Sequence, residues 1–121
     1  MRQLTYADIP VGTLSAVADL LDLDLEFLLF RHARTEEDVV VYRRDDGRIG
    51  LIHPRDSVLA DENDIVVPEP NRYSGPLTVD EARREMDELN HRFIYFIDAA
   101  DNRGKVIYLR HDGDYGLVEP E

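Results

Sequence analysis

Apolar and polar residues alternate along this chain in a pattern that occurs twice. In residues 79–89 apolar side chains recur at helical spacing, and the preceding Thr78-Val-Asp-Glu81 has the form of a capping box. Residues 92–98 (RFIYFID), 105–110 (KVIYLR) and 114–119 (DYGLVE) follow as three predicted strands, with Asp112-Gly113 as a hairpin turn. Earlier in the chain, a helix around residues 16–23 and strands at 26–32, 38–44 and 48–53 show the same order.

The two patterns are copies of one unit. A shift of 66 residues aligns Pro10–Pro54 with Pro76–Pro120 without a gap, and 14 of the 45 positions are identical. Short extended segments, at residues 2–6 and 64–73, precede the two helices. The sequence therefore predicts two β-α-β-β-β repeats, at residues 1–55 and 64–121, joined by an acidic linker at 56–63.

Both faces of the predicted strands are apolar, and this determines how the repeats should pack. One helix can cover only one face of a small sheet, and a repeat of this size is marginally stable alone. The fold class is therefore α+β, with the two repeats packed sheet to sheet as an intramolecular pseudo-dimer and the helices outside; two independent units are the alternative. We expect the contact between the repeats to use Phe27, Phe30, Val41, Tyr42, Phe93, Phe96, Ile107 and Tyr108. The sequence does not settle which of them face the helices instead, because the register is open.

Charge and composition exclude several partners. The 121 residues contain 14 Lys and Arg against 26 Asp and Glu, a net charge of −12, which disfavours direct binding to nucleic acid or to an anionic membrane. There is no cysteine, no long apolar run and no signal-peptide core, so we expect a cytoplasmic protein. Whether Met1 is the natural start stays open.

No set of residues forms a recognisable catalytic or metal-binding motif. The four histidines lack metal-ligand spacing, and the acidic run at 60–64 lacks the spacing of a calcium loop. Asp46 and Asp112 recur, but each precedes a hairpin glycine, and salt bridges are the favoured explanation for Arg44 and Arg110. We expect no enzyme activity, no cofactor and no metal.

The second repeat resembles the C-terminal domain of the long ribosome hibernation promoting factors, the ribosome-associated translation inhibitor or sigma-54 modulation family. The matching positions before the hairpin include Pro76, Glu81-Ala82, His91, Phe93 and Phe96. The family's hairpin motif corresponds to Arg44, Asp46, Gly47, Gly50, Leu51 and Pro54 in the first repeat, and to Arg110, Asp112, Gly113, Tyr115, Gly116, Leu117 and Pro120 in the second. The first repeat departs from the motif at Leu25, Ile49 and His53.

The resemblance implies a role in ribosome hibernation, a dormancy or stress response in which translation is inhibited. Ordinary long members carry a basic N-terminal domain that binds the small ribosomal subunit, and their C-terminal domain pairs with a second copy to join two ribosomes. The tandem arrangement is similar to that of the actinobacterial dormancy-associated factors. We therefore expect a non-catalytic module that reaches the ribosome through ribosomal proteins and a separate N-terminal domain. Its self-association within one chain would favour silencing of single ribosomes. A homodimerising module that joins two ribosomes, or a stand-alone protein-binding adaptor, are the alternatives.

Overall fold

The computed structural model describes residues 2–6, 9–57 and 66–120. The elements in chain order are β1 (Arg2–Tyr6), β2 (Pro10–Val11), α1 (Thr13–Asp22), β3 (Phe27–His32), β4 (Asp38–Arg43), β5 (Ile49–His53), β6 (Val66–Pro70), α2 (Val79–Leu89), β7 (Phe93–Ile97), β8 (Gly104–Leu109) and β9 (Tyr115–Pro120). They confirm an α+β fold with two roughly repeated halves. The predicted linker from residue 58 onward, and the acidic run at 60–64, lie outside the described residues.

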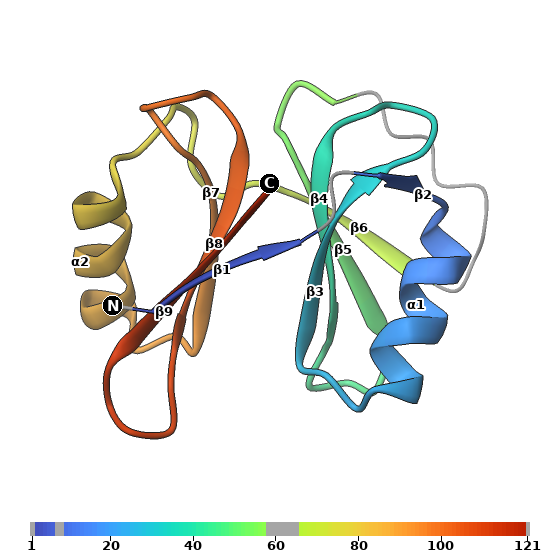
Figure 1. Ribbon diagram of the computed structural model, residues 1–121, viewed down its shortest axis with the longest axis horizontal. Coiled ribbons are helices and arrows are strands. Elements are labelled where there is room, and N and C mark those ends of the chain that lie inside the picture. The colour runs from blue at the N-terminus through green and yellow to red at the C-terminus, as the bar shows by residue number, and fades with distance from the viewer. Residues whose placement is uncertain (1, 7–8, 58–65, 121) are drawn as a thin grey trace.

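The strands form two mixed sheets. One has five strands in the order β2-β3-β4-β5-β6, and the other has four in the order β1-β9-β8-β7. Figure 1 shows the two sheets facing each other, with α1 covering the outer face of the five-stranded sheet and α2 the outer face of the other. Below, "first half" means α1 with β2–β5, and "second half" means α2 with β7–β9.

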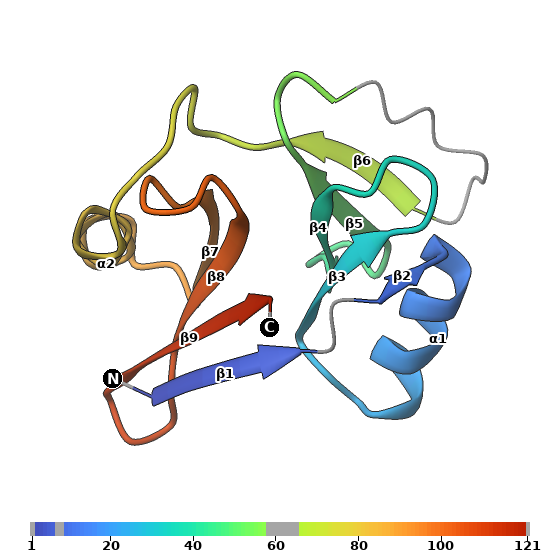
Figure 2. The same ribbon diagram turned by 45° about the horizontal axis from the view of Figure 1, so that its top comes forward.

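The strands nearest the start of each repeat are exchanged between the halves. β1 pairs in parallel with β9, so that Gln3 lies opposite Leu117, and β6 pairs in parallel with β5. Figure 2 shows β1 lying alongside β9 rather than in the sheet of the first half. The sequence correctly predicted extended segments here, but it did not predict with which strands they pair. The residues that do pair within their own half lie next to the helix: Pro10–Val11 against β3, and a single bridge from Leu77 to Asp98.

Three apolar clusters result from the alternation of side chains along the strands. Val39 and Val41 of β4 point toward α1 and join Leu20 and Phe30 in one cluster. In the second half Ile107 and Phe96 join Ala82 and Met86 of α2. The third cluster is formed by the opposite faces of both sheets and includes Leu29, Val40, Tyr95 and Val106. Each sheet is thus covered on both faces, as continuous apolar strands require.

The two helices start in different ways. Thr78 caps α2: its hydroxyl accepts from the Glu81 amide at 3.1 Å, and the Glu81 carboxylate accepts from the Thr78 amide at 3.0 Å. This confirms the predicted capping box. The N-cap of α1 is Gly12, which has no side chain to make such a bond.

Replacing Thr78 with alanine is therefore expected to lower the free energy of unfolding by about 1 kcal/mol. The amides at the first turn of α2 would lose their side-chain partner. Urea denaturation measures the loss. The matched control is Gly12→Ser, which adds a capping side chain to α1 and should raise stability by about a few tenths of a kcal/mol. An unchanged midpoint for the alanine variant would contradict a stabilising role for the capping box.

Candidate functional site: the inter-sheet interface

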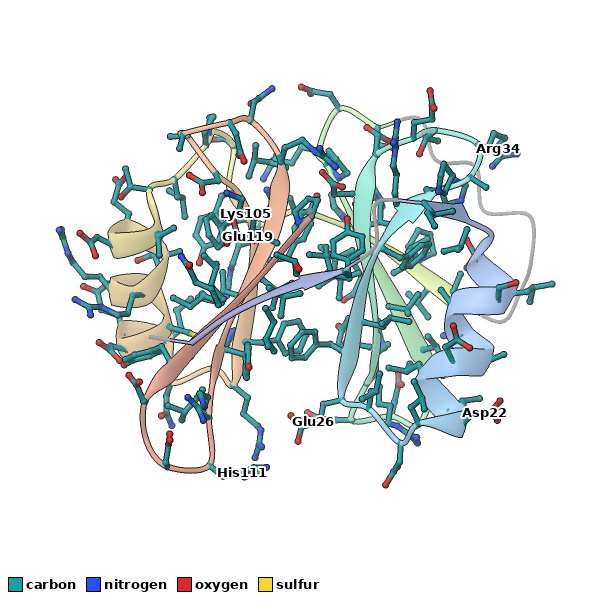
Figure 3. The ribbon with its side chains drawn as sticks, in the orientation of Figure 1. Asp22, Glu26, Arg34, Lys105, His111 and Glu119 are labelled. Carbon is teal, nitrogen blue, oxygen red and sulfur yellow. The ribbon has the colours of Figure 1, made fainter. Side chains whose placement is uncertain are left out.

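The third apolar cluster joins the two halves, and we call it the inter-sheet interface. Its buried centre consists of Leu29, Val40, Tyr95 and Val106, of which the two valines are fully buried. Partly buried side chains surround this centre: Tyr6, Phe27, Tyr42, Ile52, Phe93, Ile97 and Val118. Figure 3 shows side chains filling the space between the two sheets.

Aromatic rings contact each other across the interface in a nearly twofold arrangement. Phe27 stacks on Phe93, its equivalent in the repeat, with ring centroids 5.0 Å apart. Phe27 also lies 5.6 Å from Tyr108, and Phe93 lies 5.4 Å from Tyr42. The two halves therefore offer each other the same aromatic groups in the same positions. Such pairs add about 0.5–1.5 kcal/mol each beyond the area that they bury.

The eight residues expected at this contact divide into two groups. Phe27, Tyr42, Phe93 and Tyr108 lie at the inter-sheet interface. The other four do not: Phe30 and Val41 lie beneath α1, and Phe96 and Ile107 beneath α2. The prediction for these four is corrected. They alternate with the interface residues on the same strands, and the residues between them, Leu29, Val40, Tyr95 and Val106, are apolar enough to face either way.

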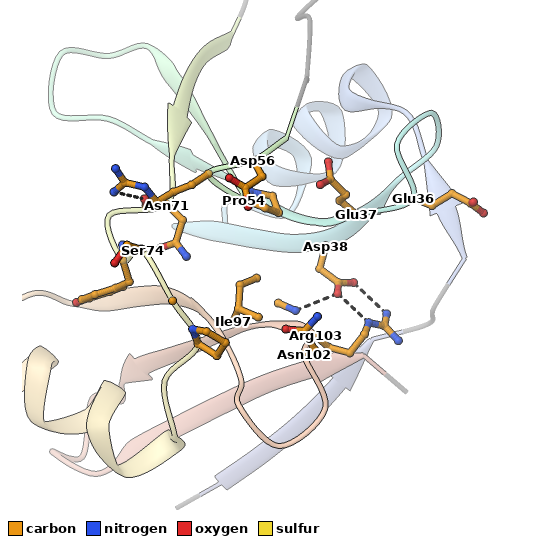
Figure 4. A pocket seen from close by; sticks show the side chains of 15 residues that line it. Glu36, Glu37, Asp38, Pro54, Asp56, Asn71, Ser74, Ile97, Asn102 and Arg103 are labelled. Carbon is orange, nitrogen blue, oxygen red and sulfur yellow. Dashed lines mark hydrogen bonds and ion pairs between the residues drawn. The ribbon is translucent and has the colours of Figure 1, made fainter.

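Asp38 at the start of β4 connects the first half to the second (Figure 4). Its carboxylate accepts from Arg103 at Nε (2.8 Å) and Nη2 (3.0 Å), and from the Gly104 amide at 3.0 Å. The Tyr6 hydroxyl donates to the same carboxylate at 2.9 Å, and the buried Tyr95 hydroxyl donates to the Asp38 carbonyl at 2.7 Å. Burial, and secondarily the charge of Asp38, raise the pKa of Tyr95 above its ordinary value. Asp38 is thus a buried anion with a complete set of donors, most of them from the second half.

The exchanged strand β6 makes a polar contact of its own with the first half. The Tyr42 hydroxyl donates to Glu69 of β6, 2.6 Å from Oε2, and Arg44 lies 3.6 Å from the same carboxylate. Burial and the bond to Glu69 raise the pKa of Tyr42 above its ordinary value. This contact helps to hold β6 against the sheet of the first half.

The family hairpin motif has structural explanations in both halves. Arg44 pairs with Asp46 at 3.1 Å and Arg110 with Asp112 at 3.5 Å, and each aspartate accepts an amide two residues later. Gly47 and Gly113 have φ values of 83° and 85°, which glycine adopts without strain. Leu51 and Leu117 are buried beneath the helices. Tyr115 donates to Asp87 of α2, while Pro54 follows β5 and Pro120 ends β9.

Gly50 and Gly116 leave room for a tyrosine ring on the neighbouring strand. Gly116 pairs with Tyr108 and Gly50 with Tyr42. A Cβ at position 116 would lie 2.2 Å from Cζ of Tyr108, and one at position 50 would lie 2.3 Å from Cε1 of Tyr42. The motif glycines therefore let these tyrosines lie flat across the strand and reach the interface.

The substitution Gly116→Ala is accordingly expected to lower the free energy of unfolding by about 1–3 kcal/mol, because the added methyl displaces Tyr108 from the interface. Denaturant unfolding measures the loss. Gly75→Ala is the matched control, since a Cβ there meets nothing within 4 Å, and it should leave stability nearly unchanged. Equal stability of the two variants would show that the ring needs no glycine beneath it.

Sequence reasoning missed a buried lysine. Lys105 on β8 lies 2.7 Å from Asp98, 3.0 Å from Asp101 and 3.4 Å from Glu119, with only 6% of its side chain exposed. Burial alone would lower the pKa of Lys105, but the bonds to Asp98 and Asp101 outweigh it and raise the pKa above the ordinary value. The signal in the sequence was a lysine at the start of an apolar strand, a few residues after Asp98 and Asp101. Its equivalent in the first half is Val39, so this cluster is not a shared feature of the repeat.

The described residues hold no group of three His, Cys, Asp or Glu side chains that could bind a metal ion. Within the same ranges, no helix is both long enough and apolar enough to cross a membrane.

Comparison with known proteins gives consistent matches. The model of the family "Sigma 54 modulation/S30EA ribosomal protein C terminus" matches residues 3–51 and 61–117. A ribosome hibernation promotion factor of Lactococcus lactis is 42% identical over 66 residues, covering 54% of this chain and 35% of the relative. The dormancy associated translation inhibitor of Mycobacterium tuberculosis H37Rv is 32% identical over 123 residues, covering 88% of this chain and 42% of the relative.

The chain thus spans well under half the length of these curated relatives. Each of the two matched segments covers one copy of the repeat and ends at the motif leucine, Leu51 or Leu117. The chain belongs to the sigma 54 modulation/S30EA ribosomal protein C-terminal family, a non-catalytic family that includes ribosome hibernation factors.

Proposed function

We propose that this chain is the self-association module of a translation-inhibiting ribosome hibernation factor, and that its two halves pair with each other instead of with a second molecule. The observation that carries the proposal is the inter-sheet interface. The inner faces of the two sheets cover each other, and Val40 and Val106 at its centre have no exposed surface. A face that is already covered offers no apolar area to another copy.

The exchanged strands support pairing within one chain. β1 completes the sheet of the second half, and β6 completes the sheet of the first. Separation of the halves would therefore break parallel strand ladders in addition to the apolar contact. The short connection between the repeats adds a high effective concentration, in the millimolar range for short flexible linkers. Pairing within the chain should then exceed pairing between chains.

Ribosome association is proposed from the relatives, whose names describe ribosome hibernation and translation inhibition. The net charge of −12 makes direct binding of this module to RNA unfavourable. We propose that contacts with the small subunit are made to ribosomal proteins, and through a separate basic domain of the intact factor. Its place of action is then the cytoplasm, and it acts by binding alone.

The test uses the intact factor that carries this chain, mixed with purified ribosomes and sedimented through a sucrose gradient. Chemically cross-linked ribosome pairs mark the position of dimers. The proposal predicts that the factor travels with single ribosomes, inhibits their translation and adds nothing to the dimer peak. A dimer peak that grows with added factor would contradict it. That result would favour the alternative, in which the halves of two chains exchange and join two ribosomes.

A protein-binding adaptor is a second candidate, favoured by the outer face of α1. Leu14 and Leu21 are 55% and 48% exposed there, whereas the equivalent positions of α2 carry Asp80 and Asp87. This face, with Asp22 beside it, suits a partner that presents apolar and basic side chains.

The variant Leu14→Asp with Leu21→Asp gives α1 the outer residues of α2, and as a surface change it should alter stability by no more than about 0.5 kcal/mol. If this chain alone sediments with ribosomes and the double variant does so equally, the α1 face is not the ribosome contact and is free for another protein. Loss of sedimentation would make α1 the ribosome contact and remove the support for an adaptor.

A further inference from the structure

We propose that charged residues at the two ends of the inter-sheet interface make the first half select the second half and reject a copy of itself. The inference deepens the proposed function and rests on it, because it explains how a face that could serve two kinds of pairing is restricted to one. The partner that it specifies is the opposite half. The partner that it excludes is a second copy of either half.

Apart from the equivalent positions Leu29 and Tyr95, which differ, the buried centre of the interface cannot make this choice. Its equivalent positions hold the same residue in both halves at Phe27 and Phe93, at Val40 and Val106, and at Tyr42 and Tyr108. At these positions, two first halves, or two second halves, would bring the same rings and methyl groups together. Selectivity therefore has to come from positions where the halves differ.

One such difference lies at the end of the interface where β3 and β7 begin. Glu26 precedes β3, and the equivalent residue before β7 is Arg92. These two side chains pair with each other across the interface, with Nη2 of Arg92 3.0 Å from Oε1 of Glu26. Figure 3 shows Glu26 at the lower end of the space between the sheets. Both side chains are exposed, so this ion pair adds little stability. It does distinguish the pairing of a first with a second half from the pairing of two identical halves.

The second difference lies at the opposite end, where β4 and β8 begin. The first half carries Glu37-Asp38, and the second half carries Arg103-Gly104 at the equivalent positions. Asp38 receives both nitrogens of Arg103 and the Gly104 amide, and its side chain is only 7% exposed. A Cβ at position 104 would lie 2.7 Å from Cβ of Asp38, so the closest approach of the two halves requires that one of them has no side chain here.

Pairing of two identical halves would lose each of these favourable contacts. Two first halves would place Asp38 against another Asp38, both cut off from solvent and without the guanidinium, and Glu26 against Glu26. Two second halves would place Arg103 against Gly104, which offers no carboxylate, and Arg92 against Arg92. Acidic residues lie on one half and basic residues on the other at both ends. Only the unlike pair satisfies both ends together.

The test exchanges these residues in the full chain. An all-acidic variant carries Arg92→Glu, Arg103→Glu and Gly104→Asp, so that the second half has the residues of the first. An all-basic variant carries Glu26→Arg, Glu37→Arg and Asp38→Gly. A reversed variant carries all six substitutions and restores unlike charges with the halves exchanged. Solution mass by light scattering and the midpoint of urea unfolding are measured for each variant and for an equimolar mixture of the first two.

Each three-substitution variant alone is expected to unfold at a lower urea concentration than the wild-type chain. The equimolar mixture should give a complex of twice the chain mass, because the halves of one variant complement those of the other. The reversed variant should be a monomer and should recover most of the lost midpoint. The inference is overturned if either three-substitution variant keeps the wild-type midpoint, or if neither the mixture nor the reversed variant recovers what was lost.

The reversed variant keeps the test decisive even where the others fail to fold. It contains all six substitutions, so a recovered urea midpoint would show that the substitutions compensate for one another across the interface. Ribosomes are absent from this experiment, which separates the two proposals. Growth of the ribosome dimer peak would contradict the proposed function and leave this selectivity standing, whereas an insensitive midpoint would contradict the selectivity alone.

Discussion

Replacing Asp38 with alanine is expected to lower the free energy of unfolding by about 2–4 kcal/mol. The substitution removes the carboxylate that accepts from the Arg103 guanidinium, the Gly104 amide and the Tyr6 hydroxyl. The expected loss is at the low end of what breaking a buried ion pair costs, because the Arg103 side chain is 36% exposed and can recover some hydration. Urea unfolding followed by circular dichroism measures the loss.

Asp46→Ala is the matched control for this prediction. It also removes a carboxylate that pairs with an arginine, but the Asp46 side chain is 45% exposed and lies in a hairpin away from the interface. Asp46→Ala should cost much less stability than Asp38→Ala, because solvent screens the exposed ion pair. If Asp38→Ala costs no more than this control, Asp38 does not connect the two halves energetically.

Replacing Phe96 with alanine is expected to cost about 3–5 kcal/mol. Phe96 is fully buried beneath α2, among Ala82, Met86 and Ile107, and its removal leaves a cavity in a cluster that the helix cannot close. Because Phe96 points away from the inter-sheet interface, the variant should lose stability without any change in solution mass. Denaturant unfolding and light scattering together measure both effects.

Phe27→Ala provides the contrast. Phe27 is only partly buried and contacts Phe93 and Tyr108 across the interface, so its truncation should cost less than Phe96→Ala and act on the contact between the halves. A loss well below 1 kcal/mol for Phe96→Ala would show that the second half does not have the core described above.

The sequence predicted the local elements well because their signals are local. Thr78 and Glu81 define a helix start within four residues, and Asp112-Gly113 defines a turn within two. The duplication added independent support, since Gly47 and Gly113 adopt the same left-handed conformation. The salt bridges expected for Arg44 and Arg110 depend on partners two residues away, and both are present.

Features that depend on distant parts of the chain could not be predicted. Leu29 and Phe30 are both apolar, so alternation alone does not tell which of them faces α1. Nothing in the sequence of β1 marks β9 as its partner, because a parallel edge strand carries no register signal comparable to a hairpin turn. Asp38 looked like a strand-start residue and Gly104 like a turn residue until the structure placed them in contact.

The inter-sheet interface also explains why the repeat diverged where it did. The stacked aromatic positions and the central valines hold the same residues in both halves, whereas the ends are complementary, as with Glu26 and Arg92. A duplicated unit whose halves must contact each other gains selectivity from such differences without losing the apolar area that holds the contact together.

The absolute mass of the chain in solution tests the central claim most directly. Light scattering behind size exclusion, over concentrations from low micromolar to several hundred micromolar, gives this mass without reference to shape. Pairing of the two halves within one molecule predicts a mass near 14.0 kDa at every concentration. A mass that rises toward twice this value with concentration would contradict it, because the interface would then be open to a second chain.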